Sequence, residues 1–461
     1  MGQTVKSLVV AAVAGGVLAG CAAYHARALP DSPDTQTRLP APKVALSSVH
    51  LPGLRPHPFD ASHGLDMTDV AILAVLNDPA LKSLRAAQHA TAYQAFAAGL
   101  LPGPQVAYSR DRVTGNSAGL VAGRSVGLAY DLNALVTSAI QKNAAEATAQ
   151  QANLNVLWAE WQTAQQASVL FLQIRHDRRQ LALLQQLRQV MDRRYRNLKQ
   201  ALHDGDISYD TLGLEYTAIQ DVDARVSTLR RDLSDARIGL NRILGLAPET
   251  KLDLVAGADG PIAPTDEQIA TALKALPQRR PDLIALQYAY RSADEAVRRA
   301  VVEQFPAINL GINRANDTSN VHTTGLDISI SFPLITGGPT YVHAAEAARD
   351  AVWQEYQQRL DQADSDVRTV VADLRLVDAQ LGQLEQALPT TEGAMQNAHA
   401  AYLRGDLTVG SYYSLAISVL NSRLQASDLE LERQQLQLAL SVQLGLPRDD
   451  LEHLSLQGKS K

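Results

Sequence analysis

The sequence is poor in the residues and patterns that most enzymes and nucleic-acid-binding proteins need. It has a single cysteine, only 5% aromatic residues and a net charge of −6, so it carries no basic surface for nucleic acid. Its 11 histidines are scattered singly, without the spacing of metal ligands. It contains neither a glycine-rich phosphate loop nor a nucleophile elbow. We therefore predict no catalytic residue, no metal and no bound cofactor, and we predict that the chain is not an enzyme.

What the sequence does contain is the composition of long packed helices. Apolar residues make up 46% of the 461 residues, and alanine, leucine and glutamine are abundant. This composition favours helical packing over a β-sandwich or a doubly wound sheet. Beyond the N-terminal segment, no uninterrupted apolar run is long enough for a transmembrane helix.

Residues 1–20 have the organisation of a secretory signal peptide. Lys6 gives a positive start, and Leu8–Leu18 is an apolar core of 11 residues, too short to span a bilayer. The next residues complete a tetrad, Leu18–Cys21, that resembles the bacterial lipobox, in which the cysteine is lipidated and becomes the mature N-terminus. The resemblance implies a covalent lipid on Cys21. The alternative is an ordinary signal peptide with an incidental cysteine.

Residues 21–65 are predicted to form a lipid-anchored tether. Tyr24–Pro58 holds seven prolines among many serines, threonines and histidines, a composition typical of an extended linker. Ala22 follows the cysteine where, in lipoproteins, an aspartate signals retention at the inner membrane. The absence of aspartate at this position therefore favours anchoring in outer-membrane lipid.

The rest of the chain is predicted to be a tandem repeat, with repeats at 66–260 and 261–450 and a tail at 451–461. Four landmarks recur in the same order, at offsets of 202, 204, 200 and 200 residues. They are Pro79 and Pro281, Pro102 and Pro306, Gly205 and Gly405, and Gly245 and Gly445. Each repeat reads as a helix, a β-hairpin (104–131 or 306–333), a long helix, a tip (205 or 405) and a second helix.

The long helices follow from the positions of glycine and proline. Both residues are absent between Gly127 and Gly205, which predicts a helix over Thr137–His203. Apolar residues between Ile219 and Ile243 alternate in steps of three and four, the spacing of a coiled-coil seam. In the second repeat, Pro389 and its neighbouring glycines predict a kink before the tip.

The predicted strands distinguish a membrane protein from a soluble scaffold. Apolar residues alternate with small or polar ones around Val106, Val126, Leu310 and Ile328, over runs of about nine residues. That length suits a tilted transmembrane strand. Four strands cannot close a barrel, and open edges are not tolerated in lipid, so several copies must pool their strands.

These features together resemble the TolC-like outer-membrane efflux proteins, in particular their lipidated branch. The resemblance rests on the lipobox at Cys21, the segment Asn77–Leu81, the run Arg279–Leu283, the pair Phe305–Pro306 and the two tip glycines. It implies a homotrimer with a 12-stranded β-barrel and a periplasmic α-barrel. The duct would receive substrate from an inner-membrane efflux pump through a periplasmic adaptor (membrane fusion) protein, with most of its mass in the periplasm.

The resemblance also points to the two tips, around Gly205 with Asp206 and Gly405 with Asp406, as a periplasmic gate. Acidic rings in the family lie six and nine residues past the second tip glycine, where this chain has Ser411 and Ser414. The usual acidic ring is therefore missing, and whether the gate binds ions stays open.

Tyr402 matches a tip tyrosine of the family that acts as a latch between neighbouring hairpins, with Asp210 as its plausible partner. The alternative for Tyr402 is plain helix packing. For Asp206 and Asp406 it is turn and helix-cap chemistry. The run Arg279–Asp282 is predicted to start a helix, with no role in substrate binding.

Two other functions compete with the duct. A lipid-anchored coiled-coil scaffold or adhesin of the cell envelope accounts for the helices but not for the strands. A periplasmic hydrolase would need a catalytic constellation. Within the duct hypothesis, the cargo stays open because the pump can carry the specificity.

Overall fold

The computed structural model describes residues 26–38, 64–115, 119–255, 264–331 and 338–446. The chain divides into two compact units, Met1–Gln36 and Thr37–Lys461. In the first unit the described residues, 26–36, are exposed. Cys21 and the predicted signal peptide lie outside the described residues, so the lipidation of Cys21 stays a prediction. Every helix and strand named below belongs to the second unit.

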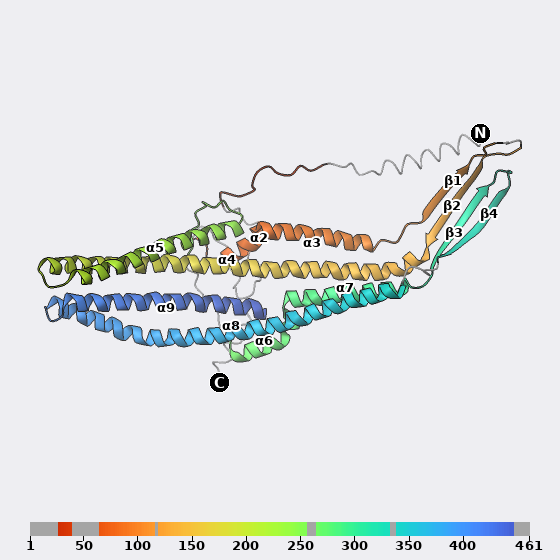
Figure 1. Cartoon of the computed structure of the whole chain (residues 1–461). Coiled ribbons are helices and arrows are strands. Elements are labelled where there is room, and N and C mark those ends of the chain that lie inside the picture. Colours follow the sequence, from red (N-terminus) through yellow and green to blue (C-terminus); the bar gives the residue numbers. More distant parts are fainter. Residues whose placement is uncertain (1–25, 39–63, 116–118, 256–263, 332–337, 447–461) are drawn as a thin grey trace. The chain divides into compact units, whose positions relative to one another are not determined.

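The second unit is built mainly from helices, which make up 73% of the described residues. The same order of elements occurs twice, and each half has two helices, a β-hairpin, a long helix and a returning helix (Figure 1). The helices of the first half are α2 (Met67–Asn77), α3 (Pro79–Ala98), α4 (Leu132–His203) and α5 (Tyr209–Ile243). Those of the second half are α6 (Asp266–Arg279), α7 (Pro281–Val302), α8 (Gly338–Leu403) and α9 (Val409–Leu444).

Helix α4 runs without a break for 72 residues. At 1.5 Å per residue its length is roughly 108 Å. It begins at Leu132 rather than at the predicted Thr137, because the Asp131 carboxylate caps it by accepting hydrogen bonds from the backbone N–H groups of Asn133 and Ala134. Among the described helices, none combines the length and the apolar character needed to cross a membrane.

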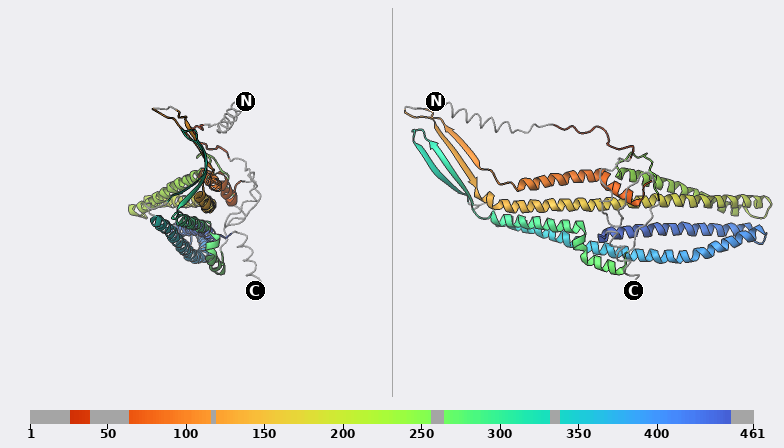
Figure 2. Two further views of the ribbon diagram at one scale, coloured as in Figure 1. Left: turned by 90° about the vertical axis from the view of Figure 1, so that its right-hand side faces the viewer. Right: turned by 180° about the vertical axis from the view of Figure 1, so that it is seen from behind.

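Helix α8 passes through the predicted kink as one helix. It spans 66 residues with Pro389 inside it, and Figure 2 shows it bowed toward the tip. Two bonds support the helix here. The Thr391 hydroxyl donates to the Leu388 carbonyl at 2.9 Å, and Arg423 of α9 pairs with Glu392 at 2.7 Å. The proline therefore bends the helix without ending it.

The predicted coiled-coil seam of α5 is the face that packs on α4. Buried seam residues of α5 are Ile219, Val222, Val226, Leu233, Ala236, Leu240 and Ile243, with Leu229 partly buried. Near the tip, this core takes residues from both repeats, because Leu420 and Leu424 of α9 join Leu184 and Leu187 of α4. The two helical hairpins of one chain thus share a core.

The four strands form one antiparallel sheet in the order β1-β2-β3-β4. They are β1 (Gln105–Asp111), β2 (Gly123–Asp131), β3 (Ala307–Asn316) and β4 (His322–Ser331). Pairing of β2 with β3 joins the two repeats, and it sets Leu128 opposite Ile312 and Tyr130 opposite Leu310. The register therefore gathers the apolar side chains of all four strands on one face. Members of this apolar face are Val106, Tyr108, Val126, Leu128, Tyr130, Ile308, Leu310, Ile312, Leu326, Ile328 and Ile330.

The run at the start of α7 is a buried ionic junction. Pro281 is the first residue of α7, as the sequence predicted, and Arg280 before it is 2% exposed. The Arg280 guanidinium donates two hydrogen bonds to the Asp282 carboxylate, at 3.0 and 2.7 Å, and lies 4.9 Å from the Trp158 ring of α4. Arg359 of α8 donates to the same carboxylate at 2.7 Å. The junction thus ties α7 to both long helices.

Candidate functional site at the hairpin tips

The two tips have the same backbone geometry. Gly205 and Gly405 have φ angles of +82° and +80°, a left-handed conformation that glycine adopts without strain. The N–H of Asp206 donates to the Ala201 carbonyl at 2.8 Å, and that of Asp406 donates to the Ala401 carbonyl at 2.9 Å. Each long helix therefore ends in a Schellman turn that reverses the chain into the next helix.

Neither tip aspartate is the N-cap of the following helix. The caps are Ser208 for α5 and Thr408 for α9. Thr408 accepts a hydrogen bond from the Ser411 N–H at 3.2 Å, and the two hydroxyls lie 2.8 Å apart. Ser411 is exposed, and its N–H and hydroxyl both contact the residue that caps α9. Asp406 instead pairs with Arg404 across the turn at 2.8 Å, with both side chains exposed.

Tyr402 belongs to a cluster of aromatic rings on α8 and α9. It is half-buried and stacks on Tyr412, with ring centroids 5.3 Å apart and planes 4° from parallel. The rings of His399 and Tyr413 are also close to Tyr412, with centroids 5.4 and 5.2 Å away. This stacking holds α8 to α9 at the tip and shows that packing is one role of Tyr402.

Asp210 lies exposed in the first turn of α5. Among the described residues of one chain, no hydrogen bond joins the Tyr402 hydroxyl to Asp210. The latch predicted from the sequence would run between neighbouring hairpins, so it stays a prediction.

A polar contact that the sequence reading missed joins three helices just above the tips. Arg194 of α4 forms an ion pair with Glu215 of α5 at 3.3 Å and donates to the Ser414 hydroxyl of α9 at 3.4 Å. Burial raises the pKa of Glu215, and the charge of Arg194 opposes that rise. The available signal was Glu215 itself, a carboxylate four residues before Ile219 on the apolar seam.

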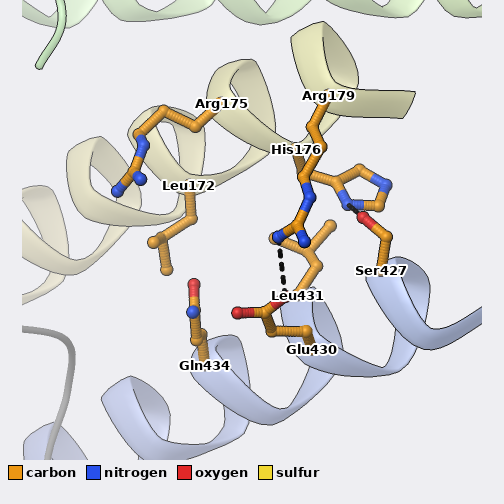
Figure 3. Close-up of a pocket in the computed structure, with 8 residues that line it drawn as sticks. All are labelled: Leu172, Arg175, His176, Arg179, Ser427, Glu430, Leu431 and Gln434. Carbon is orange, nitrogen blue, oxygen red and sulfur yellow. Dashed lines mark hydrogen bonds and ion pairs between the residues drawn. The ribbon is translucent and has the colours of Figure 1, made fainter. Parts of the chain in front are cut away.

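A second polar contact between α4 and α9 lies farther from the tips. His176 is 3.3 Å from the Ser427 hydroxyl and 3.1 Å from the Asp428 carboxylate. Arg179 reaches across to Glu430 at 3.0 Å, beside a cavity of about 180 Å³ (Figure 3). Together with the contact of Arg194 with Ser414, these bonds tie the first hairpin to the second.

Asp177 lies beside this contact on α4 and is buried. The Gln173 amide donates to one of its carboxylate oxygens at 2.7 Å, and the other oxygen has no hydrogen-bond partner among the described residues. Burial raises the pKa of Asp177, although the bond from Gln173 opposes the rise. Within the described part of the chain, no group of three or more metal-ligating side chains is placed to hold an ion.

Comparisons with known proteins agree with this architecture. Residues 272–446, most of the second repeat, match the outer membrane efflux protein family. No curated protein sequence matches the chain. A membrane protein from Pseudomonas aeruginosa shares its fold, with a TM-score of 0.70 and 18% identity over 88% of this chain and 99% of that one.

Two other solved structures show the same fold. The CusC channel gives a TM-score of 0.68 at 17% identity over 88% of this chain and 99% of that chain. The outer membrane protein VceC from Vibrio cholerae gives 0.66 at 18% identity over 83% and 96%. The fold is therefore that of the TolC-like channels, and residues 272–446 carry the match to the efflux family. Both findings confirm the predicted resemblance to the outer-membrane efflux proteins, and membership of their lipidated branch stays a prediction.

Proposed function

We propose that this chain is the outer-membrane duct of a tripartite efflux system. Three copies would form a homotrimer that conducts small molecules from an inner-membrane pump and a periplasmic adaptor to the exterior. The sheet is the observation that supports this most directly. One chain supplies four strands in register, with an exposed apolar face and two edge strands, β1 and β4, that have no partner strand in the described chain.

The exposure of the apolar face argues that lipid covers it. Val106, Ile312 and Leu326 lie in one row across the sheet, with Leu128 between the first two, and they are 73%, 59% and 70% exposed. An apolar surface of this extent is rare on a protein that stays in water. The opposite face carries serine, glycine, alanine and asparagine, which suits the lumen of a channel.

The scaffold or adhesin alternative accounts for the helical hairpins but not for this sheet. A coiled-coil scaffold has no use for four strands whose pairing joins two distant hairpins of the sequence. Open strand edges would also invite aggregation unless further strands cover them. Pooling of strands from three copies gives twelve, which removes every edge.

The tips suit the periplasmic entrance. They lie at the far end of α4 from β2, and α4 is 72 residues long. Inside one chain, α4 and α9 are tied together by Arg194 and Ser414, whereas Asp206, Asp210 and Asp406 are exposed. We infer that the exposed groups face neighbouring copies and the adaptor, and that Tyr402 and Asp210 hold the closed state.

The anchor is proposed from the lipobox alone. Mature protein carries lipid on Cys21 and fractionates with the outer membrane. Labelled palmitate should enter the wild type but not Cys21→Ser, and equal labelling of the two would remove the anchor. Because the sheet itself inserts, the unlipidated variant should still assemble.

Two measurements on purified protein test the duct. Light scattering in mild detergent should give the mass of three chains, and the protein should form conducting pores in planar bilayers. A monomer without conductance would contradict the duct and favour the scaffold. Cargo is expected to follow the pump, so exchanging the pump should change the exported compounds while this chain is kept.

A further inference from the structure

The far end of the apolar face of the sheet carries arginines instead of apolar residues. Arg110 follows Tyr108 by two positions, and Arg314 follows Ile312 by two, so alternation places them on the same face. Arg124 pairs directly with Arg110 and therefore shares that face. All three side chains are exposed. They lie at the strand ends remote from the helices, next to the β1–β2 and β3–β4 connections.

Within the described part of the chain, these arginines have no counter-charge of their own. Among the described residues, no ion pair or side-chain hydrogen bond involves any of the three. The nearby acids Asp111 and Asp327 alternate onto the opposite face. Asp317, in the adjoining turn, accepts hydrogen bonds from the N–H groups of Ser319 and Val321.

The direct pairing of Arg110 with Arg124 is unfavourable unless an anion lies between them. Like charges opposite each other on neighbouring strands repel. Arg314 stands opposite Val126, one row closer to the middle of the apolar face, so the three arginines lie on one face of three neighbouring strands. Several guanidinium groups on one face can bind the oxygens of a phosphate, because arginine binds phosphate in bidentate fashion.

The two ends of the apolar face differ in kind. Near the helices it ends in Tyr130, with Phe305 exposed just before β3. Membrane barrels usually carry aromatic girdles at both water interfaces. Here the remote interface has one aromatic residue, Tyr108, beside three arginines. A lipid surface with anionic headgroups at that side explains this difference.

We propose that Arg110, Arg124 and Arg314 form a binding site for the phosphate groups of outer-leaflet lipid headgroups. This inference rests on the proposed function, because it takes the apolar face as facing lipid and the remote strand ends as the exterior side. In a trimer the site occurs three times around the outer rim. It would fix the height of the strands in the membrane and neutralise the repulsion between Arg110 and Arg124.

Native mass spectrometry of the detergent-purified full-length protein tests the site. Lipid A, which carries two phosphates, is titrated onto the wild type, and lipid A stripped of its phosphates serves as the matched ligand. The variant Arg110→Gln/Arg124→Gln/Arg314→Gln removes the site. The control variant Arg193→Gln/Arg196→Gln/Arg225→Gln removes the same charge from exposed positions on α4 and α5.

The wild type and the control variant should bind lipid A alike, and the site variant should bind it roughly a hundredfold more weakly. Arg-to-Lys changes at the three sites should give intermediate binding, because charge is kept and the fork is lost. Inorganic phosphate at equal concentration should not displace the lipid. Should the glutamine variant fail to assemble, the lysine variant and the dephosphorylated lipid still decide the question.

Equal binding of intact and dephosphorylated lipid A by the wild type, or equal binding by the site and control variants, would overturn the proposal. Conductance and trimer mass are recorded on the same preparations. If the wild type is trimeric and conducting but binds intact and dephosphorylated lipid A equally, only this site is ruled out. A wild type that is neither trimeric nor conducting removes the proposed function instead.

Discussion

Asp282 is the single side chain on which the junction between α7 and the two long helices depends. Burial alone would raise its pKa, but hydrogen bonds and charge from Arg280 and Arg359 outweigh burial and lower the pKa below 3.8. A carboxyl with a lowered pKa stabilises the fold above its unfolded value and loses that contribution as the pH falls through the folded value. The junction should therefore be intact at neutral pH.

Asp282→Asn should destabilise the protein by about 3–5 kcal/mol, because it leaves Arg280 charged and buried without its partner. The midpoint of thermal loss of helix, followed by circular dichroism, measures the effect. Asp364→Asn is the matched control, since Asp364 pairs with Arg368 on an exposed face at 2.6 Å. Comparable losses of stability in the two variants would show that the buried junction contributes no more to stability than an exposed ion pair.

Asp177 is expected to have the opposite pH dependence. Burial raises its pKa above 3.8, so the folded chain holds the proton more tightly and stability falls as the pH rises through the folded value. Asparagine at position 177 cannot ionise. The variant Asp177→Asn should therefore be more stable than the wild type by on the order of 1 kcal/mol of unfolding free energy at pH 7, and by less at acidic pH. Thermal midpoints at both pH values, with exposed Asp235→Asn as control, check this. A gain in stability that did not depend on pH would refute the raised pKa of Asp177.

Residue chemistry was predictable where it is local. The tip glycines were found from spacing alone, because a left-handed turn between two helices requires glycine whatever surrounds it. The contact of Arg194 with Glu215 and Ser414 was missed because the bond from Arg194 to Ser414 joins residues 220 positions apart. Such a contact depends on how the repeats pack, which no local pattern records.

At the scale of elements, the period of the apolar residues predicted most of the fold. The alternation predicted which strand residues share a face, and the register confirms it. The seam of α5 was likewise predictable from steps of three and four. The continuity of α8 through Pro389 was not, since the ion pair that supports Glu392 comes from Arg423 on the neighbouring helix α9.

The two faces of the sheet should respond differently to charge. Leu310 and Ile328 are opposite each other on the apolar face, and Asn309 and Ser329 are opposite each other on the polar face. Leu310→Arg or Ile328→Arg should cost roughly 2–4 kcal/mol of insertion free energy near the bilayer midplane.

Asn309→Asp and Ser329→Asp are the controls and should be tolerated. The measured quantity is the fraction of protein that folds into lipid vesicles, read from its protection against protease. Equal impairment by changes on both faces would mean that the sheet does not separate lipid from lumen.

At the scale of the whole molecule, the fold class and the family resemblance followed from the order and spacing of weak motifs. None of these motifs is specific alone, but a duplicated series constrains the architecture strongly. What one chain does not determine is how neighbouring copies meet at the tips. In the proposed duct, opening would depend on those contacts, so a test of the gate has to be made on the assembled protein.

The proposed gate makes a prediction of this kind. Tyr402 is half-buried on α8 and Asp210 is exposed on α5, so hairpins that meet at the tips can join them by a hydrogen bond with a charged acceptor. Because serines replace the usual acidic ring, closure should depend on such bonds more than on bound cations. Tyr402→Phe with Asp210→Ala should therefore raise single-channel conductance in planar bilayers severalfold.

Tyr412→Phe is the matched control for this double variant. Tyr412 stacks on Tyr402, so the change removes a hydroxyl from the same aromatic cluster without touching the proposed latch. Its conductance should equal that of the wild type. If Tyr412→Phe opened the channel as far as the double variant, closure would rest on the packing of α8 against α9 rather than on a bond between hairpins. If neither variant changed the conductance, the constriction would lie elsewhere along the helices.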